Sequence, residues 1–80
     1  MKPEIYIPGE ELWSWFMMNR DTVEKQQILV AKNRETEHEI YVTADEDGFP
    51  VLCVYRGDAF LLSEDLLSGI DAVDTLDRLV

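Results

Sequence analysis

The sequence has few of the residues that mark a chemical site. It contains one cysteine and one histidine. A single Cys53 excludes an intramolecular disulfide, and one cysteine with one histidine cannot supply a closed set of zinc ligands. Cys53 lies within the apolar run at residues 51–55, so we expect an inert thiol in the core.

Long apolar runs are also missing. No stretch is long enough to span a bilayer, and the first residues lack the charged-then-apolar order of a secretion signal. Taken with the lone cysteine, this predicts a cytoplasmic location and no contact with a membrane.

Positive charge is scarce after residue 34. Residues 1–34 contain five acidic and five basic side chains, whereas residues 35–80 contain twelve acidic side chains against Arg56 and Arg78. The second part therefore carries the whole formal net charge of −10. Phosphate contacts need a basic patch, so this distribution disfavours direct binding of nucleic acid. It favours a basic protein as the partner.

The hydrophobic content and the length of the chain predict a small folded unit. A hydrophobic content of 46% is ordinary for a globular protein, and 80 residues allow one domain with a thin core. The pattern predicts an edge strand or extended arm at residues 2–7 and a helix over 9–18 that ends with Asn19 in the left-handed conformation. A strand is expected over 22–32, followed by a turn.

The second half has the alternation of a half-buried sheet. His38, Ile40, Val42 and Ala44 alternate with polar or aromatic residues, which predicts a strand with one apolar face. A turn at 45–48, a central strand over 49–56 and a short strand over 59–62 follow.

The end of the chain is expected to be helical. We predict one helical turn near 64–67 and a helix over 71–79, capped by Asp71 and carrying an Asp74–Arg78 pair. The predicted fold is α+β: an N-terminal helix, an antiparallel meander of three to four strands and a C-terminal helix, with both helices packed on one face of the sheet.

Three motifs resemble functional sites but fit them poorly. Residues 43–48 resemble part of a calcium loop that lacks the carboxylates required at its ends. His38 and Cys53 are expected on one face of neighbouring strands, in a setting too apolar and acidic for a reactive thiolate. Residues 56–58 spell Arg-Gly-Asp, which resembles an integrin-recognition sequence and suits a tight turn better. We therefore expect no catalytic residue, metal or cofactor, and a small enzyme using His38 or Cys53 is the third hypothesis.

The leading hypothesis is a non-enzymatic protein whose acidic second half contacts a basic partner. In its most concrete version the protein is an inhibitor or a nucleic-acid mimic that occupies the basic groove of a nucleic-acid-binding enzyme or a toxin. The predicted contact residues lie on a strand, a turn and a helix face, and they are Glu35, Glu37, Glu39, Asp45, Glu46, Asp47, Asp71, Asp74 and Asp77.

The second hypothesis is a homodimer formed through the N-terminal helix, with the acidic charge serving solubility only. A surface helix normally keeps one polar side, but this one carries large apolar residues on two sides. Aromatic and methionine side chains dominate many interfaces. The predicted patch consists of Trp13, Trp15, Phe16 and Met17.

Overall fold

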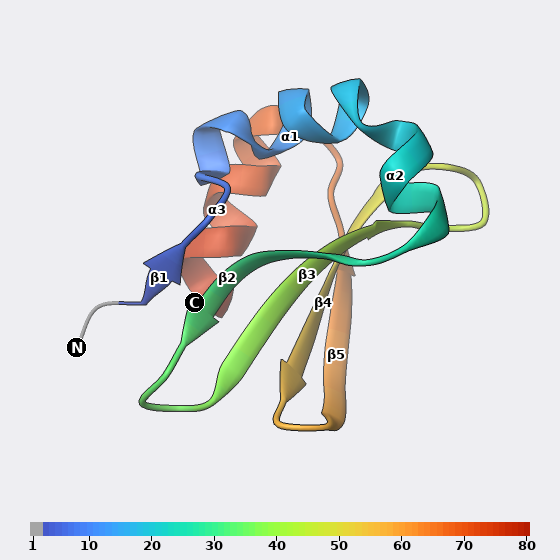
Figure 1. Cartoon of the computed structure of the whole chain (residues 1–80). Coiled ribbons are helices and arrows are strands. Elements are labelled where there is room, and N and C mark those ends of the chain that lie inside the picture. The colour runs from blue at the N-terminus through green and yellow to red at the C-terminus, as the bar shows by residue number, and fades with distance from the viewer. Residues whose placement is uncertain (1–2) are drawn as a thin grey trace.

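The computed structural model describes residues 3–80, so residue 2 of the expected N-terminal arm lies outside the described residues. The fold is α+β, as the sequence predicts (Figure 1). The sheet is antiparallel with the strand order β1-β2-β3-β4-β5. In chain order the elements are β1 (Glu4–Ile5), α1 (Gly9–Met18), α2 (Arg20–Lys25), β2 (Ile28–Asn33), β3 (His38–Ala44), β4 (Pro50–Arg56), β5 (Ala59–Asp65) and α3 (Gly69–Leu79).

The sheet has five strands where three to four were expected. The additional edge strand is β1, which was expected as either a strand or an arm. Glu4 pairs with Lys32 and Ile5 pairs with Ala31, so β1 extends the sheet beyond β2.

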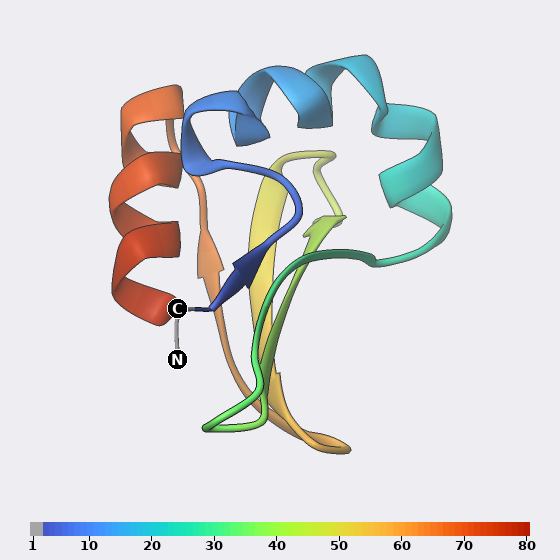
Figure 2. The same ribbon diagram turned by 60° about the vertical axis from the view of Figure 1, so that its left-hand side comes forward.

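The helices lie on one side of the sheet. Figures 1 and 2 show α1 crossing one end of the strands and α3 running from that end along the sheet, and the two helices pack against each other. Their apolar sides enclose a single core with the inner face of the sheet. The fully or almost fully buried members of this core include Leu12, Phe16, Val30, Ile40, Val42, Leu52, Leu66, Ala72 and Leu76.

The two-residue period of β3 gives the apolar face that was expected. Ile40 pairs with Val54 and Val42 pairs with Leu52, so these side chains share the inner face. Tyr41 pairs with Cys53, which places both on the outer face.

A second helix, α2, occupies part of the segment that was expected to be a strand. Asn19 has φ −123° and ψ 30°, which is not the left-handed conformation, and its carbonyl oxygen accepts the N–H groups of Thr22 and Val23. The chain therefore turns from α1 into α2. Val23 is fully buried in the core, so tertiary packing outweighs the strand preference of a β-branched residue here.

The last strand is longer than expected. Glu64 pairs with Leu52, so the predicted helical turn at 64–67 is wrong and β5 continues to Asp65. Arg78 donates to the carboxylate of Glu64 at 2.7 Å instead of pairing with Asp74. This ion pair ties α3 to the far end of β5, a long-range contact that helical spacing does not reveal.

Candidate functional site

A groove of about 320 Å³ opens where α1, the turn before β4 and the end of β5 meet. Its floor and walls are apolar, with Leu66 buried at its base, while Phe49 is 59% exposed and Leu67 81% exposed. Two acidic residues are among those that line it. The residues that line this acidic groove are Trp13, Asp45, Phe49, Asp65, Leu66 and Leu67.

The turn before β4 fixes one wall of the acidic groove. The Asp45 carboxylate accepts the N–H groups of Asp47 at 2.9 Å and Phe49 at 2.8 Å. Gly48 has φ +84°, a conformation that glycine adopts without strain, and its carbonyl accepts a hydrogen bond from the Arg20 guanidinium at 3.1 Å. Phe49 is therefore held towards solvent by a well-bonded turn.

The start of α3 fixes the opposite wall. The helix is capped by Ser68, whose hydroxyl accepts the N–H of Asp71 at 3.1 Å, and not by Asp71 as was expected. In return the Asp71 carboxylate accepts the N–H of Leu67 at 2.8 Å. These reciprocal bonds hold Leu67 outward, and Ile70 in the first turn of α3 is 79% exposed.

The carboxylates around the acidic groove are poorly neutralised. Within residues 3–80, the ion pairs engage Glu4, Glu39 and Glu64, and none of these lines the groove. Asp65 makes no side-chain hydrogen bond in this part of the chain, and the nearby Arg20 donates to a carbonyl rather than to a carboxylate. The groove therefore combines exposed apolar surface with two acidic residues that form no ion pair among residues 3–80.

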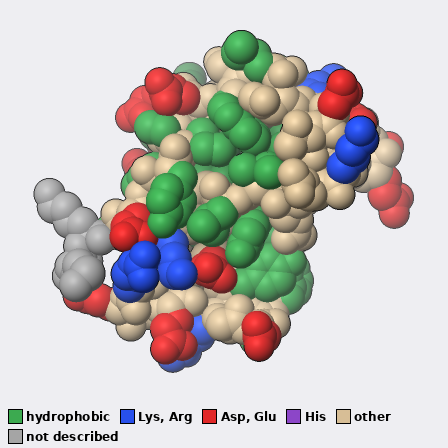
Figure 3. Space-filling view, viewed as in Figure 1, with side chains coloured by type: hydrophobic (Ala, Val, Ile, Leu, Met, Phe, Trp, Pro, Cys, Tyr) green, Lys and Arg blue, Asp and Glu red, His purple; other side chains and the backbone are tan. Residues whose placement is uncertain are grey.

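The other acidic residues expected at the contact lie elsewhere. Glu35 and Glu37 are in the β2–β3 turn, and Glu37 has φ +65° there instead of continuing the strand. The seven residues of β3 separate this turn from Asp45 by roughly 20 Å, at about 3.3 Å per residue. Asp74 and Asp77 are exposed on α3. Figure 3 shows acidic side chains at separate points around one face of the molecule, with apolar patches between them.

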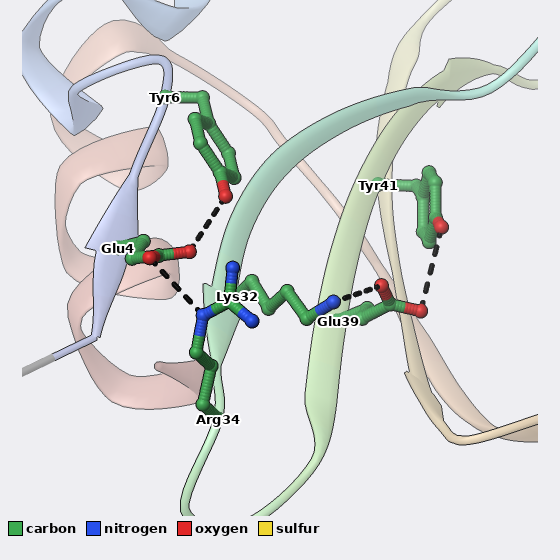
Figure 4. Close-up of polar contacts among 6 residues, drawn as sticks. All are labelled: Glu4, Tyr6, Lys32, Arg34, Glu39 and Tyr41. Carbon is green, nitrogen blue, oxygen red and sulfur yellow. Dashed lines mark hydrogen bonds and ion pairs between the residues drawn. The ribbon is translucent and has the colours of Figure 1, made fainter.

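Glu39 belongs to a polar network on the outer side of the sheet. Its carboxylate lies 3.4 Å from the ammonium of Lys32 and accepts a bond from the Tyr41 hydroxyl at 3.5 Å (Figure 4). This lysine offsets the charge of Glu39, so Glu39 adds little to an acidic contact surface.

A second polar cluster lies at the edge strand β1. The Glu4 carboxylate accepts a hydrogen bond from the Tyr6 hydroxyl at 2.7 Å and another from Arg34 at 3.1 Å (Figure 4). These two bonds, that of Tyr6 first, hold the pKa of Glu4 below its usual value.

The aromatic patch expected on α1 is only partly at the surface. Phe16 is fully buried, because it points from α1 into the core, and this corrects its assignment to a contact surface. Trp13 and Trp15 are half-buried and pack against the same core. Met17 is 41% exposed, and the neighbouring Met18 is 84% exposed. The homodimer surface thus loses its central aromatic residue.

His38 and Cys53 do not form a nucleophilic pair. His38 aligns with Arg56 and Cys53 with Tyr41, so the two side chains lie on opposite faces of the sheet, and the expected common face is wrong. In residues 3–80, no three acidic, histidine or cysteine side chains are grouped to hold a metal ion.

Burial raises the pKa of the Cys53 thiol, which is 7% exposed. A higher pKa lowers the fraction of reactive thiolate. We expect iodoacetamide at pH 8 to alkylate Cys53 more slowly in the folded protein than in denaturant, as followed by mass spectrometry. Equal rates would contradict this account of the thiol.

Four of the groove residues were not expected at a site: Phe49, Asp65, Leu66 and Leu67. Phe49 was assigned to the central strand, and the other three to a helical turn. The signal available in the sequence was a large apolar residue between Gly48 and Pro50, where a turn leaves little room for burial.

In the described part of the chain, no helix has the length and apolar character needed to cross a membrane. In comparisons with protein-family models, curated proteins and solved structures, the chain matches none.

Proposed function

We propose that this protein is a non-enzymatic binding domain for a basic protein partner, and that the contact is centred on the acidic groove. The observation that carries the proposal is the coincidence of Phe49 and Leu67, both largely exposed, with the carboxylates of Asp45 and Asp65 in one groove. Exposed apolar patches rimmed by polar groups are typical of interaction sites.

The apolar and the acidic residues of the groove have different roles in binding. Burial of Phe49 and Leu67 against a partner supplies affinity, because apolar area removed from water is stabilising. The carboxylates select for lysine and arginine and raise the association rate, since the net charge of −10 attracts a basic molecule over distance. The preferred ligand is therefore a segment with one or two apolar anchors flanked by basic residues.

The position of the groove favours one version of the binding hypothesis that was drawn from the sequence. An inhibitor that mimics nucleic acid needs a row of carboxylates, but Glu35 and Glu37 lie far from Asp45 along β3. A local contact is better supported than an extended phosphate mimic. The single cysteine makes a reducing, cytoplasmic setting part of the same proposal.

The test is capture of partners by groove variants. In Asp45→Asn/Asp65→Asn two charges are removed, and the side-chain amide oxygen introduced at position 45 can still accept the turn's hydrogen bonds. Immobilised wild-type protein is expected to retain basic proteins from a lysate of its own organism, and the variant is expected to retain several-fold less. Quantitative mass spectrometry provides the measurement, at low and at high salt, because salt screens exposed charges.

A matched control removes the same charge elsewhere. Glu37→Gln/Asp77→Asn changes two exposed carboxylates outside the groove and leaves the net charge equal to that of the groove variant. Capture is expected to survive in this control. If both variants lose the same proteins to the same extent, diffuse charge rather than the groove attracts them, and the proposal fails.

A further inference from the structure

The two edges of the sheet are protected to very different degrees. At one edge, β1 has only two residues, and its Glu4 forms an ion pair with Arg34, which directly follows β2. At the other edge, β5 has seven residues, and all of residues 59–63 are exposed. The strand order leaves β5 without a neighbour beyond β4. Its outer edge therefore presents backbone groups that can pair with another strand.

The exposed part of β5 is also apolar. Phe60, Leu61 and Leu62 are 56%, 46% and 40% exposed. Leu62 aligns with Val54 on the inner face and Phe60 with Tyr55 on the outer face, so apolar side chains are available on both sides. Proteins usually protect such an edge with lysine, proline or a covering segment.

β5 has few of these protections. Residues 59–65 contain no lysine, arginine or proline. A shift of register opposite Val54 and Tyr55 interrupts the pairing once, and Arg78 from α3 reaches only Glu64 near the end of the strand. A long, apolar edge of this kind is a template for strand addition.

We propose that the exposed edge of β5 binds an extended segment of the basic partner as an additional antiparallel or parallel strand. This inference rests on the proposed function and specifies how the partner binds. Backbone hydrogen bonds along residues 59–63 provide the main attachment. Phe60 and Leu62 contact alternate apolar side chains of the added strand, one on each face of the sheet.

Charge decides between a basic partner and a second copy of this chain. Asp58 precedes β5 and Asp65 ends it, so an added strand meets a carboxylate at each end. Lysine or arginine at the ends of the added strand would pair with them. Two copies of the protein would instead bring together two molecules of net charge −10, which repel. The charge therefore favours a basic segment.

The position of Asp65 connects this edge with the acidic groove. Asp65 is the last residue of β5 and also lines the groove beside Leu66 and Leu67. A segment that runs along β5 towards Asp65 arrives at the groove, where an apolar side chain can pack against Leu67 and Phe49. Strand addition and groove binding are thus two parts of one contact.

The probe is a capped seven-residue peptide of alternating lysine and valine, added to ¹⁵N-labelled wild-type protein. Two peptides serve as controls: one has glutamate in place of lysine, and the other carries three consecutive N-methyl groups at its centre, which block both of its hydrogen-bonding edges. The lysine–valine peptide is expected to shift the amide resonances of residues 59–65 and to slow their hydrogen exchange. N-methylation is expected to weaken binding by about tenfold or more, because several backbone hydrogen bonds are lost.

Each of the following outcomes overturns the binding of a basic strand at β5. Shifts confined to Trp13, Phe49 and Leu67, with the N-methylated peptide bound equally well, would place the contact in the groove alone. Equal binding of the glutamate peptide would remove the charge argument. Shifts of residues 59–65 caused by raising the protein concentration, without peptide, would identify a second copy as the occupant. The proposed function is decided separately, by capture with the groove variants.

Discussion

The Phe16→Ala variant is expected to lose about 3–5 kcal/mol of the free energy of unfolding, the usual cost of truncating a buried phenylalanine. Phe16 is fully buried between α1 and the sheet, so its removal leaves a cavity in a thin core. The total stability of a domain with 80 residues is about 4–12 kcal/mol on a per-residue basis. The variant is therefore expected to lose a large share of its stability, which urea titration by circular dichroism measures.

Two further variants separate the core from the surface of α1. Met18→Ala removes a side chain that is 84% exposed and is expected to change stability by less than about 0.5 kcal/mol. Phe16→Leu keeps most of the apolar volume and is expected to cost less than Phe16→Ala. If Phe16→Ala leaves stability unchanged but abolishes self-association in sedimentation equilibrium, Phe16 is an interface residue and the core assignment is wrong.

The regular parts of the fold follow from local pattern. The helix over 9–18 was predicted with the bounds that the structure shows, because acidic residues near its start and the absence of glycine and proline from residues 12–18 are local signals. The buried face of β3 follows from its strict alternation, because a slip of one residue would move Ile40 and Val42 out of the core.

The errors occur where a long-range contact decides the local structure. Val23 is helical because α2 covers one end of the sheet, although its own preference is for a strand. Glu64 extends β5 because it pairs with Leu52 and binds Arg78 of α3. The spacing of apolar residues in the sequence predicts none of these long-range contacts, so the end of β5 was assigned to a helix.

The candidate site was predicted only in part, for the same reason. The carboxylates of Asp45 and Asp71 were expected at the contact, and the structure places Asp45 in the groove and Asp71 in the cap that holds Leu67. Asp45 and Asp71 are grouped with Phe49 only because α3 begins near the β3–β4 turn, and the sequence does not show this arrangement. Composition revealed the charge but not the apolar surface beside it.

Two glycines in the helices are expected to respond in opposite ways to the same substitution. Gly9 begins α1, and a Cβ added there would lie 3.0 Å from the Cα of Val73 in α3. Backbone cannot move aside as a flexible side chain can, so Gly9→Ala must push the two helices apart. We expect a loss of about 1–3 kcal/mol, as for other overpacked contacts.

Gly69→Ala is the matched control, because Gly69 begins α3 just as Gly9 begins α1. A Cβ there would lie 3.7 Å from the Cβ of Trp13, which is an ordinary van der Waals distance. Alanine reduces the freedom of the unfolded chain and favours helix, so we expect a gain of about 0.5 kcal/mol. Urea titration of both variants provides the comparison. Equal effects would mean that α1 and α3 are not in close contact at Gly9, and the groove between Trp13 and the start of α3 would then lose its structural basis.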